Sequence, residues 1–466
     1  MFQGRFFCRI VKLKARLDSK PQLPFSEVLT EERINAVLEE LNVTYRDRVY
    51  SPCVTLWVFL SQVLSADHSC SNAVARLLAF RVARGQAPCS SETGSYCQAR
   101  KRLPEELLSR LTRQTGQELH KEADASWRFH GRSVKIVDGS TDSMPDTPEN
   151  EAAFGKPRNQ RGAAGFPLTR IVALLCLATG AALELAIGPY RGKKTGELSL
   201  FRQLQHTLET GDILLGDRLF CTYCDLARLV ARRVDVVMRV HAHRKVDFRR
   251  GQRLGHGDHL VTWHKPTRRP NWLSPEEFAA LPPQLQLREV RVQVTIPGFR
   301  LRSLVVVTTL DNHKEFPPEE IARLFRQRWH VELDLRSIKS VMQMDVLRCQ
   351  TPEMVRKEIW AHLLAYNLLR SVMCAAAVEH DLPVREISFK GALQLLNAFH
   401  QTIITSEPGQ LESLCTTLLK AVSQRRVGDR PNRYEPRKRK RPPKPYPKMT
   451  LPREQERKLC LRKPIR

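Results

Sequence analysis

The sequence predicts an α/β protein whose mixed-sheet core is interrupted by a β-rich insertion. Two apolar, β-branched runs, VKIVD and DILLGD, have the composition of buried strands. Four further strand-like segments, VDVVMRV, HLVTWH, REVRVQVTI and LRSLVVVTTL, follow between residues 236 and 310. The stretches before and after this region have helical patterns instead, which predicts helices on both sides of a sheet-forming region.

Five regions follow from these patterns, because a chain of 466 residues is too long for one small core. They are a helical N-terminal region (1–125), the first half of the core (126–235), the β-strand insertion (236–310), the second half of the core with further helices (311–424) and a basic, proline-rich tail (425–466).

The charge balance predicts a polyanionic partner. The chain has 76 lysines and arginines against 49 aspartates and glutamates, a net charge of +27. Nucleic acid is the default partner for such a chain, although a basic protein of the ribosome or of a membrane surface has a similar composition. The tail has 17 basic and 4 acidic residues with eight prolines, so we expect no compact fold there, and RKRKR at 437–441 suits an electrostatic arm.

The N-terminal region predicts several helices. Thr30 precedes Glu-Glu-Arg as a helix start, and VTLWVFLSQVLS is an apolar helix. Ser95 and Gln98 have the spacing of a capping box before ARKRLPEELLSRLTRQ. We therefore expect Arg100 to Arg102 at a basic helix start that faces DNA, the alternative being a solvated surface with ion pairs along the helix.

Two aspartates end the predicted core strands. Asp138 closes VKIVD and Asp217 closes DILLGD, and ligands of open α/β sheets bind at the carboxyl ends of strands. Asp142 and Asp146 are weaker candidates because their segment is rich in turn residues, where Asp is common for backbone reasons. Asp212 precedes its strand, so we expect it at the opposite edge of the sheet.

The longest apolar stretch, residues 171–188, is nearly long enough to span a membrane. Glu184 lies inside it and Thr179-Gly180 interrupts it, which favours two buried strands of a hairpin. We predict no membrane span and, from an N-terminus with interspersed charges, no signal peptide. The 12 cysteines are scattered; Cys221 and Cys224 form a CxxC pair that suits a buried place at a helix start better than a metal site.

One segment, PPEEIARLFRQRWHVELDLRSIKSVM, carries four chemically distinct residues at helical spacing. Pro317-Pro318 and the following acids are helix-start signals. At about 100° per residue, Phe325, Arg328, Glu332 and Lys339 fall within an arc of roughly 60°. A carboxylate between two cations suits a site for a metal ion and a phosphate, and the alternative is a helix with ordinary ion pairs such as Arg328–Glu332.

These segments together resemble the DDE transposases of bacterial insertion sequences, in the group named for its YREK signature (insertion-sequence family four). The signature reads Tyr, two residues, Arg, three residues, Glu, six residues, Lys, and this chain fits it from Phe325 to Lys339 with Phe in place of Tyr. The segments at Asp138 and Asp217 also resemble that group, as do QARKRLP, PDTPEN and LLAYNLLR. The resemblance covers roughly residues 30 to 440 and implies an RNase H-like core with a β-strand insertion.

The resemblance also implies roles for the residues. Asp138, Asp217 and Glu332 would hold two Mg²⁺ or Mn²⁺ ions, the cations that oxygen-only ligands suit. Phe325 lacks the hydroxyl of Tyr and would serve packing. Arg328, Lys339 and, with less support, Arg218 and Arg239 would bind DNA phosphates, and Trp263 or Trp272 would stack on a flipped base, the alternative being a tryptophan of the core.

Three functions are consistent with this reading. The first is a cytoplasmic, nucleoid-associated transposase that binds the terminal inverted repeats of an insertion sequence in double-stranded DNA and works as a homodimer or a larger synaptic complex. The second is an RNase H-like nuclease without strand transfer. The third is a non-catalytic DNA-binding protein derived from a transposase; the presence of all three carboxylates argues against it.

Overall fold

The computed structural model describes residues 29–46, 48–159, 162–163, 165–241, 243–293, 303–406, 408–428 and 451–462. The chain divides into two compact units. We name them the sheet unit, which comprises residues 125–178, 184–334 and 429–466, and the helical unit, which comprises residues 1–124, 179–183 and 335–428.

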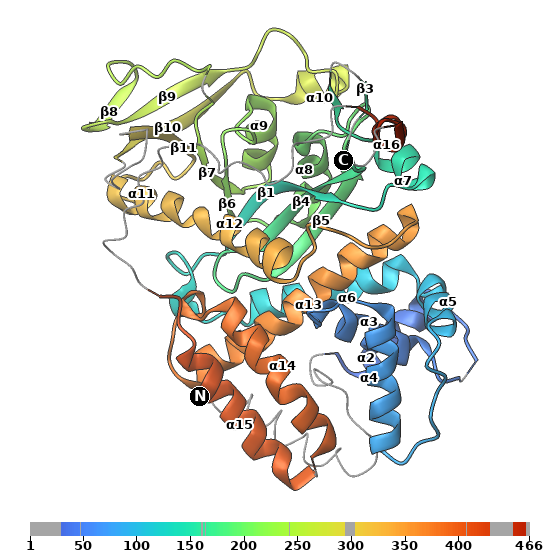
Figure 1. The fold of residues 1–466 in the computed structure, drawn as a ribbon. Coiled ribbons are helices and arrows are strands. Elements are labelled where there is room, and N and C mark those ends of the chain that lie inside the picture. Colours follow the sequence, from blue (N-terminus) through green and yellow to red (C-terminus); the bar gives the residue numbers. More distant parts are fainter. Residues whose placement is uncertain are drawn as a thin grey trace. The chain divides into compact units, whose positions relative to one another are not determined.

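A nine-stranded mixed sheet organises the sheet unit (Figure 1). Its order is β5-β4-β1-β6-β7-β11-β10-β9-β8. The first five strands in that order are β5 (Ala182–Pro189), β4 (Leu168–Cys176), β1 (Val134–Ser143), β6 (Ile213–Gly216) and β7 (Asp235–Arg239). β1, β6 and β7 run parallel and β4 is antiparallel to β1. The expected mixed α/β sheet is therefore confirmed, and this arrangement is consistent with an RNase H-like core.

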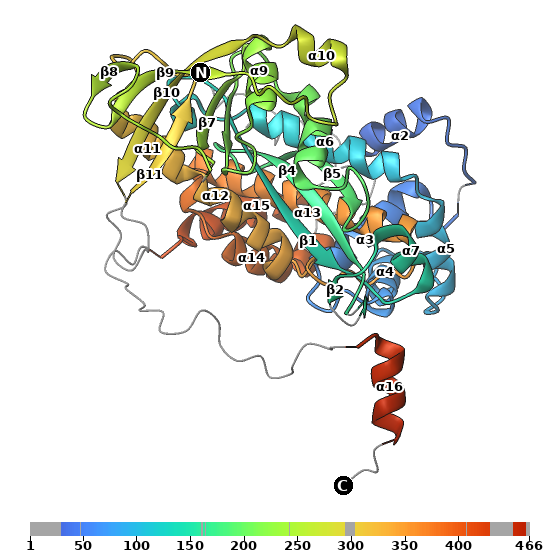
Figure 2. The same ribbon diagram turned by 90° about the horizontal axis from the view of Figure 1, so that it is seen from above.

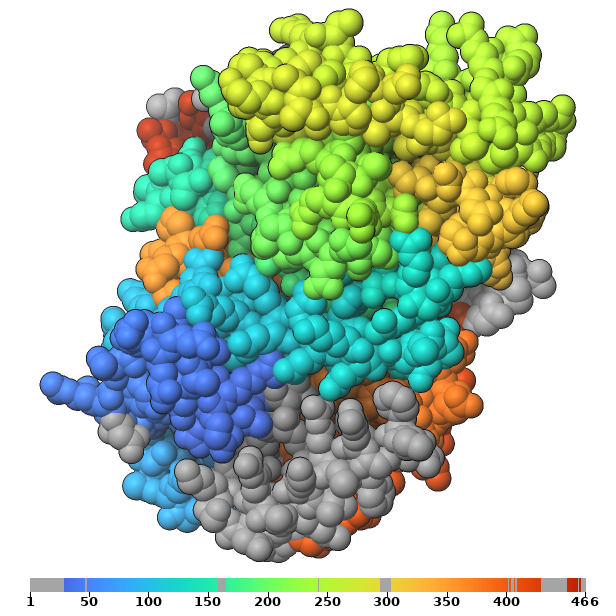
Figure 3. Space-filling view, turned by 180° about the vertical axis from the view of Figure 1, so that it is seen from behind, coloured from blue at the N-terminus to red at the C-terminus, as the bar shows by residue number. Residues whose placement is uncertain are grey.

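The β-rich insertion continues the same sheet. Its strands are β8 (Gln252–Gly255), β9 (Asp258–His264), β10 (Gln284–Gln293) and β11 (Ser303–Thr308), with the short helix α10 (Pro275–Ala280) after β9. β11 pairs antiparallel with β7, and the segments of the insertion form one continuous yellow and yellow-green surface in Figure 3. β7 was predicted within the insertion, but its parallel pairing with β6 groups it with the core strands.

Two helices cover one face of the core strands (Figure 2). α8 (Glu197–Leu204) buries Leu200, Phe201 and Leu204, and α9 (Tyr223–Ala231) begins just after Asp217. The predicted hairpin is also present, since β4 and β5 are neighbours on either side of Thr179-Gly180. The segment from 148 to 163 contains the short helix α7 (Pro148–Phe154) and the strand pair β2 (Arg158–Asn159) and β3 (Gly162–Ala163).

The helical unit begins with the helices that the sequence predicted. Thr30 caps α2 (Glu31–Glu40) by accepting a hydrogen bond from the Arg33 amide, and the apolar segment forms α3 (Pro52–Leu64). The helices α4 (Cys70–Ala83), α5 (Gly94–Arg102), α6 (Glu105–Lys121), α14 (Phe389–Thr405) and α15 (Pro408–Gln424) also belong to this unit.

The expected basic helix start at Ser95 is wrong. Leu103-Pro104 separates α5 from α6, because proline cannot continue a helix, and α5 starts after Thr93 without a side-chain cap. Arg100 therefore lies in the last turn of α5, where it is buried, bonds the Gln62 side chain and stacks over Phe59 and Tyr96. Lys101 and Arg102 remain exposed.

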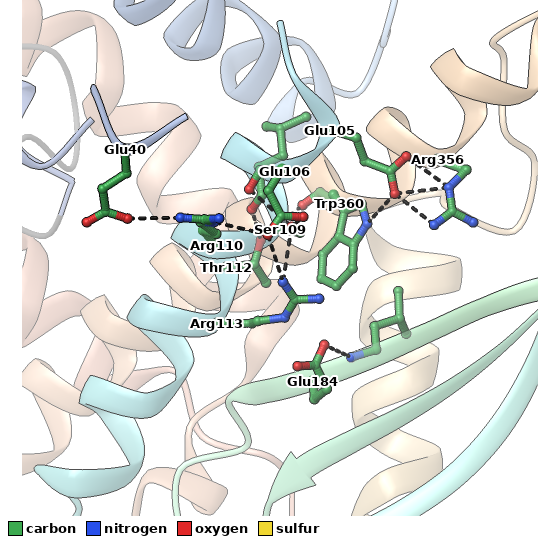
Figure 4. Close-up of polar contacts among 12 residues, drawn as sticks. Glu40, Glu105, Glu106, Ser109, Arg110, Thr112, Arg113, Glu184, Arg356 and Trp360 are labelled. Atoms are coloured by element: carbon green, nitrogen blue, oxygen red, sulfur yellow. Dashed lines mark hydrogen bonds and ion pairs between the residues drawn. The ribbon is translucent and has the colours of Figure 1, made fainter. Parts of the chain in front are cut away.

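Helix α13 (Pro352–Glu379) is the long central element of the helical unit. Its Arg356 and Trp360 both bond Glu105 at the start of α6 (Figure 4). Asn367 donates to the carbonyl of Ala182 and accepts from its amide. Within the described residues α13 is the one helix long and apolar enough to cross a membrane, and 78% of that stretch is buried inside the protein.

Part of the C-terminal tail forms a helix. This helix is α16 (Arg453–Arg462), whereas residues 429–450, including the RKRKR arm, lie outside the described residues. Arg453 of α16 lies over the Phe166 ring and 3.4 Å from an oxygen of Asp146.

Candidate active site

The two strand-borne aspartates lie at one edge of the core strands. β6 ends at Gly216, so Asp217 directly follows its strand as predicted. β1 does not end at Asp138, because it continues beside β4 to Ser143. Its pairing with β6 stops at Ile136–Leu215, and the same register two residues further sets Asp138 beside Asp217. At Asp138, β1 is no longer paired with β6. Among the described residues, no neighbouring strand on this side of β1 covers the backbone or the side chain of Asp138.

The Asp138 carboxyl is largely buried, with 23% of its side chain exposed. It accepts a hydrogen bond from the Gly139 amide at 2.8 Å. Burial raises the pKa of Asp138 to about 6; the Gly139 amide and Arg328 lower it, and Glu332 and Glu197 raise it further. The ionised form of Asp138 is therefore disfavoured mainly by its withdrawal from water, and a cation bound beside the carboxylate would favour that form.

The signature segment forms two helices with a turn between them. α11 (Pro318–Gln327) ends just before Arg328, and α12 (Trp329–Arg336) carries Glu332. The Arg328 guanidinium lies 3.0 Å from a Glu332 oxygen and 3.8 Å from an Asp138 oxygen. This arginine therefore links the signature segment to β1. The Arg328–Glu332 ion pair expected of an ordinary surface helix is present. The contact of Arg328 with Asp138 is additional, because a helix with ion pairs of its own does not require it.

Phe325 is buried on the core face of α11, with 6% of its surface exposed. Lys339 lies in η3 (Ser337–Val341), a π-helical turn of the helical unit. A turn at Arg328 and a π-helical turn at Lys339 interrupt the regular α-helix. Arg328 nevertheless keeps α-helical backbone angles, and its ion pair with Glu332 four residues later places these two side chains on one face. The π-helical turn changes the spacing at Lys339, so the expected stripe is not regular through its last member.

Arg218 and Arg239 lie at the ends of neighbouring core strands. Arg218 is exposed in the turn after β6. Arg239 is the last residue of β7 and is half-buried, one residue beyond the last pair of β7 with β6, Gly216–Met238. The register therefore brings Arg239 to the sheet edge that carries Asp217.

Trp263 is unsuited to base stacking, and that expectation is corrected here. Only 2% of its surface is exposed, its indole N–H donates to Glu289, and the Arg244 guanidinium lies over its ring. It is a core tryptophan of β9, the alternative stated above. Trp272 is half-buried, with the Arg202 guanidinium 3.5 Å from the centre of its ring.

Three further aspartates were candidates for metal ligands, and they lie in surroundings different from those of Asp138 and Asp217. Asp212 precedes β6, is buried and pairs with Lys135 at 2.7 Å, at the opposite strand end from Asp217. Asp146 pairs with Lys156 at 2.7 Å. Asp142 was expected in a turn, but it is a fully buried residue of β1.

Cys221 and Cys224 are buried at the start of α9, as expected. Burial raises the pKa of both thiols, that of Cys221 to about 12. Neither is therefore a reactive thiolate at neutral pH.

Three carboxylates have the oxygen chemistry that Mg²⁺ or Mn²⁺ prefers: Asp138, Asp217 and Glu332. In the described part of the chain no three His, Cys, Asp or Glu side chains converge closely enough to hold a metal ion. Arg328 occupies one Glu332 oxygen in this conformation, so Glu332 would have to exchange this ion pair for the cation. The donor set fits the cation, provided that the side chains adjust.

Glu197 is a neighbour of the site that the sequence analysis missed. It is the first residue of α8, half-buried, and close enough to Asp138 to raise its pKa. The signal was the Thr-Gly-Glu that precedes the apolar positions of LSLFRQL, a helix start after a strand of the core.

Comparisons with known proteins identify the family of this chain. Residues 129–368 match the family described as the transposase DDE domain. The transposase InsG for insertion sequence element IS4 of Escherichia coli K12 is 29% identical over 93% of this chain and 96% of its own length. The transposase for insertion sequence element IS421 of Escherichia coli is 33% identical over 15% of this chain and 19% of its length.

Among solved structures, the cryo-EM structure of the piggyBac transposase synaptic complex with hairpin DNA aligns at a TM-score of 0.44 and 10% identity. The alignment covers 88% of this chain and 86% of that one. That likeness is too weak to add to the fold described above. The match to the family, which spans more than half of the chain and contains Asp138, Asp217 and Glu332, is decisive: the chain belongs to the DDE transposase family, in the group of insertion sequence element IS4.

Proposed function

We propose that this transposase binds the terminal inverted repeats of an insertion sequence and moves the element by metal-dependent strand cleavage and strand transfer. The observation that carries the proposal is the sheet edge at Asp138 and Asp217, with Arg328 joining Asp138 to Glu332. When bound, divalent cations supply a polarised phosphate and an activated attacking oxygen. Asp138, Asp217 and Glu332 hold these cations.

The cationic side chains position the DNA in this proposal. Arg328 binds the phosphate next to the scissile bond, where a guanidinium forms two parallel hydrogen bonds. Arg218 and Arg239 follow the backbone along the same sheet edge, and Lys339 binds a further phosphate. The net charge of +27 supports binding of long duplex DNA.

The proposal extends to assembly and location. Two element ends have to be held together, so we propose a homodimer or a larger synaptic complex. The DNA substrate implies work in the cytoplasm, on the nucleoid.

Excision of the element tests the proposal. A plasmid that carries the gene flanked by its own ends is incubated with Mg²⁺ and the wild-type protein, Glu332→Ala, Asp217→Ala or the control Glu319→Ala, an exposed glutamate of α11. We expect excision and joining to target DNA by the wild type and the control alone. Cleavage without joining would indicate a nuclease. End-specific binding without cleavage would indicate a non-catalytic DNA-binding protein. Excision by Asp217→Ala would mean that the carboxylates of the site are wrongly assigned.

A further inference from the structure

Gly139 follows the first aspartate of the site and has a steric role. A Cβ atom at this position would lie 2.6 Å from Glu197 Cδ, 2.8 Å from Cγ and 2.9 Å from Oε2. These distances are shorter than any van der Waals contact, so the Glu197 carboxyl occupies the space that a side chain at 139 would need. Gly139 is not among the residues with positive φ. Its backbone angles therefore suit alanine, and the three atoms nearest to the added Cβ all belong to the Glu197 side chain.

Helix α8 holds Glu197 in this place through its packing. Phe201 lies one turn after Glu197 and its ring contacts that of Phe220 edge-on, with 5.2 Å between the centres. Phe220 closes the turn that begins at Asp217, since its amide donates to the Asp217 carbonyl at 3.0 Å. Leu200 packs on Gly188 of β5, where a Cβ atom would approach it to 2.8 Å. Helix α8 therefore packs both on β1, through Glu197 at Gly139, and on the turn after Asp217, through Phe201 at Phe220.

The chain just before Glu197 is fixed as well. The Arg170 guanidinium donates to the Thr195 carbonyl at 2.6 Å, and the Thr195 hydroxyl donates to the Gly192 carbonyl at 3.0 Å. Glu197 itself is half-buried, and within the described residues its carboxylate has neither a hydrogen bond nor an ion pair. Within the described residues no cationic side chain pairs with this carboxylate, so it is available to a bound cation.

We infer that Glu197 is a fourth carboxylate of the active site and binds a divalent cation together with Asp138. This inference rests on the proposed function, because it needs the cation that the proposed strand cleavage uses. It also explains the Asp-Gly pair at 138–139: the aspartate is a ligand, and the glycine makes room for the second ligand beside it. Hard cations such as Mg²⁺ and Mn²⁺ accept six oxygen ligands, so a further carboxylate fits their coordination.

Binding of Mn²⁺ to the full-length protein without DNA tests the inference, with free Mn²⁺ followed by electron paramagnetic resonance. Glu197→Gln keeps the size of the side chain and removes its charge, and we expect Mn²⁺ binding to weaken about 10-fold, an effect typical for residues that support a metal site. Glu209→Gln is the matched control, because Glu209 is exposed and precedes β6 at the other end from Asp217.

Gly139→Ala gives a second, steric test. The added methyl group displaces the Glu197 carboxyl but leaves every charge in place, so this variant should also weaken Mn²⁺ binding. In a background of Glu197→Ala the clash is gone. The double variant should therefore bind Mn²⁺ as Glu197→Ala does alone, whereas a purely structural role of Gly139 would make the two effects add.

The outcomes separate this inference from the proposed function. Wild-type Mn²⁺ affinity in Glu197→Gln, together with a loss in Asp138→Asn, would overturn the role of Glu197 and leave the metal site intact. Absence of Mn²⁺ binding in the wild type would overturn both. Excision by the wild type but not by Glu332→Ala, with unchanged Mn²⁺ binding in Glu197→Gln, would keep the transposition proposal and discard only the fourth carboxylate.

Discussion

The Arg328 guanidinium lies beside the carboxylates of both Glu332 and Asp138. It therefore partly neutralises these two carboxylates in the absence of DNA. Arg328→Met keeps the length of the side chain and removes the charge. If Arg328 also contacts a phosphate, the slope of log affinity for duplex DNA against log salt concentration should fall by about 0.9, the effect of one phosphate contact, and strand cleavage should be lost.

Arg323→Met is the control for this experiment, since Arg323 is an exposed arginine of α11 whose side chain is 62% accessible. A salt slope in Arg328→Met equal to that of the wild type would restrict Arg328 to holding carboxylates.

Phe325 tests what the aromatic position of the signature contributes. It is buried on the core face of α11, so Phe325→Ala should lower the free energy of unfolding by about 3 kcal/mol through lost contacts and a cavity. Leu333→Ala, on the exposed side of α12, should change it little. Urea titrations give both values, and a small loss for Phe325→Ala would mean that the ring is not a packing residue. Phe325→Tyr should keep excision activity, and increased activity would assign a role to the hydroxyl.

Individual residues were predictable where local sequence fixes their position. Asp217 directly follows an apolar run, so its place at the strand end follows from the run itself. Arg100 was misplaced, and Trp263 was left between the core and base stacking, because burial depends on partners far away in the sequence, namely Gln62 and Glu289. The contact of Glu197 with Gly139 is likewise invisible in the sequence, since 57 residues that include α7 and the strands β2 to β5 lie between them.

At the scale of elements, the boundaries were harder to predict than the elements themselves. The core strands and the helices α2, α3 and α13 match apolar patterns of the sequence. β1 is longer than predicted because β4 supplies a partner to Ser143, beyond the apolar run. The signature helix is interrupted at Arg328 although no proline or glycine marks the place.

Helix α13 carries a buried histidine that should make the helical unit sensitive to acid. His362 stacks on His68 with 5.9 Å between the rings. Burial lowers the pKa of both to about 4, from 6.5. The unfolded chain therefore takes up protons from pH 6.5 downward and the folded chain does not, so stability is complete above pH 6.5 and is lost as the pH falls toward 4.

Between pH 7 and pH 5 the loss should be about 2 kcal/mol for each histidine. In His362→Gln about 2 kcal/mol of this pH dependence should disappear, as measured by urea unfolding at the two pH values. His256→Gln, an exposed histidine, should retain the wild-type dependence. An unchanged pH dependence in His362→Gln would mean that His362 is not the acid-sensitive group.

For the whole molecule, charge is the dominant property, and much of it lies in the tail. Replacement of Arg437–Arg441 by five glutamines removes five positive charges. Non-specific affinity for duplex DNA should fall, and the salt slope should decrease by up to about 4.5, or 0.9 for each charge that contacts a phosphate. A chain with the same five residues in the order KRRRK should bind as the wild type, because this attraction does not depend on order. An unchanged salt slope in the glutamine variant would mean that the arm does not contact DNA.

The last strand of the insertion also has a consequence for the whole molecule. A nine-stranded sheet ends in a row of unpaired backbone groups that could recruit a strand from another copy. Here that outer position belongs to β8, which has four residues, the exposed Arg253 and an irregular register between Arg253 and Gly255. Short length, charge and a bulge all oppose strand addition. Copies of this chain that come close together are thereby hindered from joining strand to strand at the β8 edge.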